Sequence, residues 1–157
     1  MESESTMPAD VSRVRVRVTR RLKASRQRVY RAWTEPELMM KWFAEPDYDM
    51  RIVALDLRVG GRYRFEGEHD GQGWVLEGEF LEVRPAERLV YTWKWETDKN
   101  LGGPGDTVVT VDFREAGKET ELTVTQEGFT NELARSEHDR GWIGCLDRLA
   151  DVVSREA

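Results

Sequence analysis

The sequence feature that most constrains the fold is a change of hydrophobic period near residue 131. From residue 50 to 128, apolar and polar residues alternate in short segments separated by turn residues, and from 131 to about 155 apolar residues recur at helical spacing. The first pattern predicts strands at 50–58, 62–68, 74–85, 87–96, 107–115 and 120–128. So long a run of antiparallel strands must cover its apolar face, and only the final helix is long enough to lie across it. We therefore expect a sheet that curls around a C-terminal helix.

The N-terminal part adds one strand and two short helices to this plan. Alternation from 13 to 22 predicts the first strand, and Ser25 is placed to cap a helix that runs through Trp33. The stretch "TEPE" that follows has the pattern of a capping box with proline in the first turn, which predicts a second helix from Thr34 to about Phe43. The expected order is strand, two short helices, six strands and one long helix.

Composition limits the domain count and the class of partner. The chain has 157 residues and a net charge of -6, which favours one domain and argues against a nucleic-acid binder or a peripheral membrane protein. In the base-rich stretch 13–31, Arg13, Arg15 and Arg17 alternate with valines and are interpreted as the solvent-facing side of a half-buried strand. Residues 1–11 lack a periodic apolar pattern, so we expect a disordered tail and a single domain at 12–157. No stretch predicts membrane insertion, and the lone Cys145 cannot form an internal disulfide, so a cytoplasmic location is expected.

Motifs for nucleophilic, nucleotide-dependent or metal chemistry are not found. Two histidines and one cysteine cannot build a usual zinc site, so neither a metal nor another cofactor is expected. His138 and Cys145 share a helix face but lie two turns apart, about 10 Å, which is too far for a direct hydrogen bond. No catalytic residue is assigned. His138 and Glu82, the one carboxylate expected to point inward, are the candidates for carrying a proton.

The stretch "LVYTWKWE" places Tyr91, Trp93 and Trp95 on one side of one predicted strand. Such rings could fill a solid core, or they could form one wall of a small-molecule pocket, because such pockets are lined by aromatic side chains with few polar groups. Gly141 and Gly144 place small residues beside Trp142 in the final helix. There the helix either packs closely on the sheet or leaves room.

Four stretches carry a resemblance to a known family. "RVYRAWTEPELMMKWF", "LDLRVGGRYRF", "GEFLEVRPAERLVYTWKW" and "HDRGWIGCLDRLADVV" occur in the order found in single-domain proteins similar to the C-terminal domain of the activator of the heat shock protein 90 ATPase. These proteins belong to the START-like or SRPBCC superfamily. The resemblance implies an α+β helix-grip fold with a seven-stranded curved antiparallel sheet, and a deep pocket between its concave face and the C-terminal helix, with the two short helices closing one end. In the family pattern a histidine shortly precedes the Gly-Trp pair, which places His138 at the pocket rim or against a neighbouring carbonyl.

The resulting hypothesis is a carrier or sensor that binds a small hydrophobic molecule, such as a lipid, sterol or polyketide, between the sheet and the C-terminal helix. A cyclase or hydrolase that uses the same cavity, and a protein that interacts with the chaperone, remain alternatives. A monomer or weak homodimer is expected. Rings packed tightly against the helix, without room for a few water molecules, would remove the carrier and the enzyme hypotheses. The predicted ligand-binding residues are Trp33, Trp42, Tyr63, Phe65, Trp74, Phe80, Tyr91, Trp93, Trp95, Val109, Val111, Phe113, His138, Trp142, Cys145 and Leu146.

Overall fold

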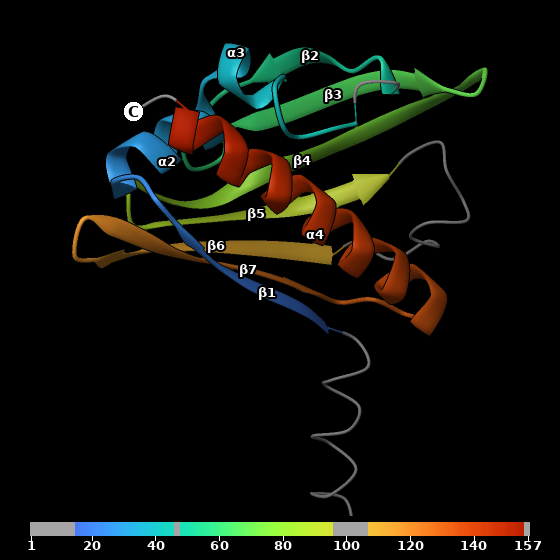
Figure 1. The fold of residues 1–157 in the computed structure, drawn as a ribbon. Coiled ribbons are helices and arrows are strands. Elements are labelled where there is room, and N and C mark those ends of the chain that lie inside the picture. Colours follow the sequence, from blue (N-terminus) through green and yellow to red (C-terminus); the bar gives the residue numbers. More distant parts are fainter. Residues whose placement is uncertain (1–14, 46–47, 96–106, 156–157) are drawn as a thin grey trace, which may run out of the picture.

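The fold is one curved antiparallel sheet of seven strands with three helices on its concave side (Figure 1). The computed structural model describes residues 15–45, 48–95 and 107–155. Strands follow the order β1-β7-β6-β5-β4-β3-β2 across the sheet. The elements along the chain are β1 (Arg15–Leu22), α2 (Arg26–Thr34), α3 (Pro36–Met39), β2 (Arg51–Leu55), β3 (Arg62–His69), β4 (Gln72–Arg84), β5 (Arg88–Trp95), β6 (Thr107–Ala116), β7 (Glu119–Glu127) and α4 (Glu132–Arg155).

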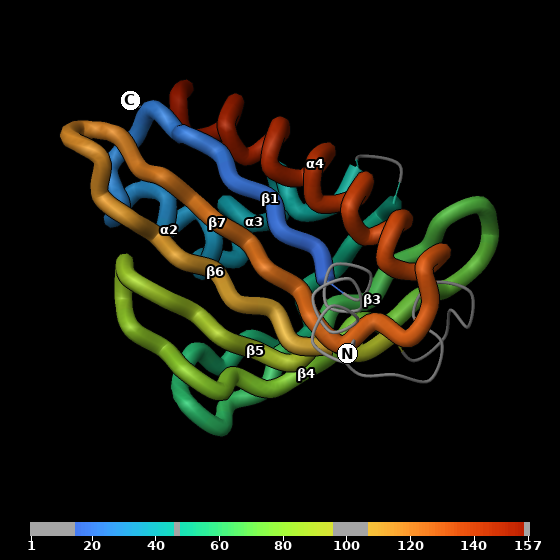
Figure 2. The backbone as a smooth tube through the Cα atoms, turned by 90° about the horizontal axis from the view of Figure 1, so that it is seen from below, coloured from blue at the N-terminus to red at the C-terminus, as the bar shows by residue number. Residues whose placement is uncertain are grey.

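Helix α4 lies across the concave face of the sheet, and Figure 2 shows the strands curving beneath it. Its buried residues recur every three or four positions, so one stripe of the helix faces the sheet while charged residues face water. The predicted seven-stranded sheet and long C-terminal helix are confirmed. The buried stripe consists of Ala134, His138, Trp142, Leu146, Leu149 and Val153.

The predicted N-terminal cap is found for α2 but not for α3. The Ser25 side chain caps α2 by accepting a hydrogen bond from the backbone N–H of Arg28 at 3.2 Å, which confirms the predicted cap. The capping box predicted for the second helix is wrong, because Thr34 belongs to α2 and donates its hydroxyl to the carbonyl of Tyr30 at 2.8 Å. Helix α3 also ends at Met39 and not near Phe43.

Strand β2 is shorter than the predicted strand at 50–58. It pairs only with β3, at the edge of the sheet, and its register shifts between Ile52 and Ala54. This irregularity leaves Val53 more than half exposed and turns Leu55 partly inward. A five-residue edge strand with a bulge is held by few ladder hydrogen bonds, so this border of the sheet is weakly tied to the rest.

None of the helices in residues 15–45, 48–95 and 107–155 is both long and apolar enough to cross a membrane. The same residues hold no group of three or more histidine, cysteine or acidic side chains placed to hold a metal ion. The predicted tail at 1–11 lies outside the described residues, and the domain boundary at residue 12 stays a prediction.

Candidate functional site

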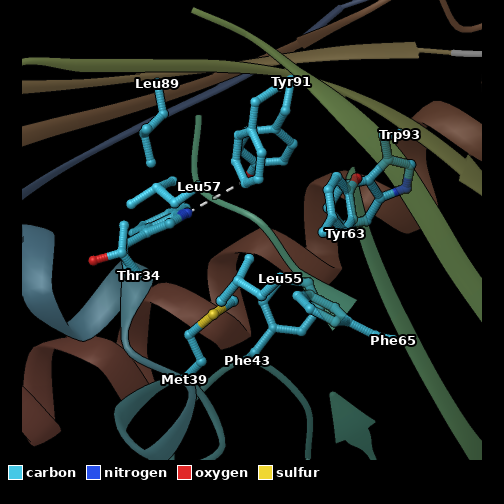
Figure 3. Close-up of a pocket in the computed structure, with 12 residues that line it drawn as sticks. Thr34, Met39, Phe43, Leu55, Leu57, Tyr63, Phe65, Leu89, Tyr91 and Trp93 are labelled. Atoms are coloured by element: carbon cyan, nitrogen blue, oxygen red, sulfur yellow. Dashed lines mark hydrogen bonds between the residues drawn. The ribbon is translucent and has the colours of Figure 1, made fainter. Parts of the chain in front are cut away.

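An apolar cavity lies between strands β3 to β5 and the short helices (Figure 3). Its volume is about 20 Å³, measured as the space open to the centre of a water molecule, and a space of this size holds roughly one water. None of the residues around it comes from α4. The lining residues are Trp33, Thr34, Met39, Phe43, Leu55, Leu57, Tyr63, Phe65, Phe80, Leu89, Tyr91 and Trp93.

Strand β5 supplies one wall through alternate residues. Leu89, Tyr91 and Trp93 project from this strand toward the cavity in a row, as Figure 3 shows, because successive side chains of a strand alternate between its faces. The opposite wall comes from the region between α3 and β3. We call Met39, Phe43, Leu55 and Leu57 the outer wall, since they lie on α3, on the edge strand β2 or directly after one of these elements.

The ring of Tyr63 is held across the inner face of β4 at Gly78. A Cβ atom on Gly78 would lie 2.7 Å from a carbon of that ring, so a residue with a side chain would displace it. The Tyr63 hydroxyl then reaches β5, where it donates to the carbonyl oxygen of Thr92. Burial raises the pKa of Tyr63 well above its ordinary value, which keeps the hydroxyl neutral. Its hydrogen is therefore already engaged.

Tyr91 and Trp33 form a polar contact at the cavity. The indole nitrogen of Trp33 donates to the Tyr91 hydroxyl oxygen at 3.4 Å, drawn as a dashed line in Figure 3. Burial is the main cause that raises the pKa of Tyr91, and it outweighs the opposite effect of the Trp33 hydrogen bond. All the lining residues are uncharged. The site can therefore hold apolar matter without a charged partner.

The side of the interior beneath α4 is filled. The Trp142 ring lies 5.4 Å from that of Trp93 and stacks against that of Trp33 at 6.0 Å. Its indole nitrogen donates to Gln126 at 2.7 Å, and the Gln126 amide donates to the Thr107 hydroxyl at 2.8 Å. The interior beneath α4 is thus packed around Trp142, and the observed cavity lies at the end of the concave face that the short helices close. Whether a ligand binds between the sheet and α4 stays a prediction.

The predicted ligand-binding residues divide between the cavity and other parts of the interior. Six of them border the cavity, namely Trp33, Tyr63, Phe65, Phe80, Tyr91 and Trp93. The remaining aromatic and aliphatic members are buried or half-buried elsewhere in the core, namely Trp42, Trp74, Trp95, Val109, Val111, Phe113, Trp142 and Leu146. Whether any of them binds a ligand stays a prediction.

His138 is buried and bonded through both ring nitrogens. Its Nε2 accepts from the Trp95 indole at 2.9 Å, and its Nδ1 lies 2.8 Å from the carbonyl oxygen of Ala134. Since an indole N–H can only donate and a carbonyl can only accept, the ring is the neutral tautomer with its hydrogen on Nδ1. The contact with a neighbouring carbonyl is as expected, and a place at the rim of the observed cavity is not found.

Glu82 does not point inward. The register of β4 shifts between Phe80 and Glu82, so the alternation that predicted an inward carboxylate is interrupted there. The Glu82 side chain keeps 38% of its surface exposed and pairs with Arg84 at 3.1 Å. The prediction of a buried acid is therefore wrong.

Cys145 faces the chain beyond α3 and not the cavity. Its thiol donates to the carbonyl oxygen of Phe43 at 3.0 Å, and burial raises its pKa to about 11. Arg148, one turn further, donates to the carbonyl oxygen of Trp42 at 3.0 Å. Gly141 is exposed, and a Cβ atom there would meet nothing within 4 Å, so it leaves no room toward the sheet.

The sequence analysis missed the outer wall, together with Thr34 and Leu89, as cavity residues. Leu55 and Leu57 do alternate within the predicted strand at 50–58, and this spacing could have assigned them to the inner face. It also missed Gln126, which has the same parity as the inward-facing Leu122 and Val124 on β7. A polar residue at an inward position signals a buried hydrogen-bonding partner.

A curved antiparallel sheet that grips a long C-terminal helix, with short helices beside an apolar cavity, defines the helix-grip class of the START-like superfamily. Residues 23–154 match the model of the family described as Activator of Hsp90 ATPase homolog 1-like protein, and the chain belongs to this family.

Solved structures agree with this assignment. A protein from Chromobacterium violaceum is 32% identical over 88% of this chain and 96% of its own, with a TM-score of 0.80. A Mesorhizobium loti protein is 26% identical over 91% and 98% of the two chains, with a TM-score of 0.73. A Rhodobacter sphaeroides protein, 20% identical over 94% and 96%, shares the fold with a TM-score of 0.78. No functionally curated protein matches the chain.

Proposed function

We propose that the protein is a carrier or sensor that binds a small hydrophobic molecule in the cavity beside β5, and that the outer wall moves outward to admit it. The observation that carries this proposal is a partly open, almost wholly apolar cavity with one wall built on the edge of the sheet. Lipids, sterols and polyketide-like compounds remain the candidate classes. A cytoplasmic location and a monomeric or weakly dimeric state are part of the same proposal.

Movement is required because the cavity is small. A pocket for a drug-sized ligand has a volume of roughly 300 Å³ or more, far above the space present here. An interior with unfilled apolar space loses dispersion contacts, and an apolar ligand would restore them. The small cavity thus corresponds to a ligand-free form in this proposal.

The outer wall is the part that can move at the lowest cost. Strand β2 pairs with one neighbour only, and helix α3 has four residues. Two hydrogen bonds from α4 hold the turn after α3, one from Cys145 to the Phe43 carbonyl and one from Arg148 to the Trp42 carbonyl. The other walls belong to paired strands and to α2, so their displacement would break more of the ladder.

The alternatives have less support. The cyclase or hydrolase hypothesis relied on His138 and Glu82, and neither borders the cavity. A chaperone partner is suggested by the family description alone.

The test is a titration of the protein with the neutral dye Nile red and with a lipid, a sterol and a flat polyketide, followed by tryptophan and dye fluorescence. The variant Leu55→Phe enlarges an outer-wall side chain that lines the cavity and should weaken binding about tenfold or more. Val53→Phe is the matched control, because Val53 lies on the same strand and is 52% exposed. Absence of saturable binding for every compound, or equal weakening by both variants, would contradict the proposal.

A further inference from the structure

The Tyr91 hydroxyl is a buried donor whose own hydrogen has no acceptor in the described part of the chain. It accepts from the Trp33 indole, and no other hydrogen bond involves it. Tyr91 is only 5% exposed, so bulk water rarely reaches it, and the cavity that it lines has room for roughly one water. A buried donor without an acceptor in the protein is rare in native structures, so this hydroxyl can donate to a molecule that enters the cavity.

The other hydroxyl groups at the cavity are already used. Tyr63 donates to the Thr92 carbonyl, and Thr34 donates to the Tyr30 carbonyl at 2.8 Å. The Trp93 indole nitrogen is also buried without a hydrogen-bond partner, and Figure 3 shows it on the side of the ring away from Tyr91. The polar capacity left over at this site therefore consists of donors, and Tyr91 is a lining residue whose hydroxyl hydrogen is not used within the described part of the chain.

Trp33 makes the Tyr91 hydroxyl a better donor. A hydroxyl that accepts a hydrogen bond becomes polarised, and the hydrogen bond that it donates is strengthened. This pair is held in place because Trp33 is 3% exposed and stacks against Trp142. The hydroxyl is thus oriented before any ligand arrives.

Charge decides which acceptor fits. No lysine, arginine or histidine lines the cavity, so a carboxylate placed there would be desolvated without a counter-charge. A carbonyl oxygen of a neutral molecule accepts one hydrogen bond at a much smaller desolvation cost. Building on the proposed function, we infer that the ligand is a neutral apolar compound with a carbonyl group, such as a ketone, ester or quinone, and that Tyr91 binds this group.

The experiment compares three probes of equal chain length, namely 2-undecanone, undecane and undecanoate, at pH 7.5 by displacement of Nile red. The ketone should bind about tenfold more tightly than the alkane, and undecanoate should bind most weakly. Tyr91→Phe should abolish the preference for the ketone over the alkane. Tyr63→Phe removes a hydroxyl at the same cavity whose hydrogen is already engaged, so it should keep the preference.

A second measurement does not depend on any variant. The infrared carbonyl stretch of bound 2-undecanone should shift to lower frequency relative to the ketone in hexane, as expected for an accepted hydrogen bond. An unshifted band, equal binding of ketone and alkane, or tightest binding of undecanoate would overturn the assignment to Tyr91 while Nile red binding still supports the carrier. Failure of Nile red and all three probes to bind would overturn both proposals.

Discussion

The two halves of the interior are closed in different ways. Beneath α4 the rings of Trp93 and Trp142 interlock, and hydrogen bonds link Trp142 through Gln126 to Thr107. Beside the short helices, apolar side chains leave a residual space, and the outer wall closes it from the edge of the sheet. Helix α4 is therefore a fixed part of the core, and the side of the interior that can change shape lies at β2.

The largest expected effect compares one leucine from each half. Leu146 is fully buried on the inner face of α4, whereas Leu55 is half-buried on β2. Leu146→Ala should lower the free energy of unfolding by about 4 kcal/mol, and Leu55→Ala by only about 1 kcal/mol, because a well-packed site cannot relax around the lost atoms. Urea denaturation measures both values. Equal losses would remove the distinction between the two halves.

The next effect concerns the two buried hydrogen bonds that Gln126 makes with Trp142 and Thr107. Gln126→Met keeps a similar volume but leaves the Trp142 indole and the Thr107 hydroxyl without their amide partner. The free energy of unfolding should fall by about 3 kcal/mol, since each unpaired buried group costs about 1 to 3 kcal/mol. Thr125→Val, the adjacent position, is the control and should cost well under half as much. A near-neutral Gln126→Met would mean that water or a rearranged side chain replaces the amide.

Part of this structure could be predicted from the sequence alone. The change from strand to helix period predicted the sheet, the long helix and the inward positions of Tyr91 and Trp93, because burial of one face imposes that alternation. Such periodicity does not report local irregularities. The bulge that turns Glu82 toward Arg84, and the one that exposes Val53, each break the pattern by one residue and reverse which face a side chain occupies.

The position of the cavity could not be predicted from the sequence, for a different reason. Whether rings stand apart or interlock depends on distances of about one methyl group, which no residue pattern encodes. The small side chains near Trp142 were consistent with either outcome. In the structure Gly141 faces open space, and Trp142 itself occupies the region beneath the helix.

The third effect tests the contact between the two halves, in which the Cys145 thiol on α4 donates to the Phe43 carbonyl. Burial raises the pKa of Cys145 to about 11 from an ordinary value of 9.0, so at pH 8 the folded protein should react with a thiol reagent about 100-fold more slowly than the unfolded chain. Because the folded-state pKa is the higher one, this contribution to stability is complete below pH 9 and is lost as the pH rises toward 11. Cys145→Ala should lack that alkaline loss. Rapid labelling of the folded protein at pH 8 would show instead that the outer wall already opens.

The smallest expected effect concerns the hydrogen bond from Arg148 on α4 to the turn after α3. Arg148→Met removes the hydrogen bond to the Trp42 carbonyl and should lower the free energy of unfolding by only about 1 kcal/mol, since the side chain is half-buried. Hydrogen exchange should accelerate in the amides of β2 and the turn after α3, while β7 stays protected, because only the former depend on this contact. Arg140→Met, which removes an ion pair on the exposed face of α4, should leave both regions unchanged. If Arg148→Met accelerates exchange in β2 and β7 alike, the outer wall does not open as a separate unit, and the ligand would need a route through the paired strands.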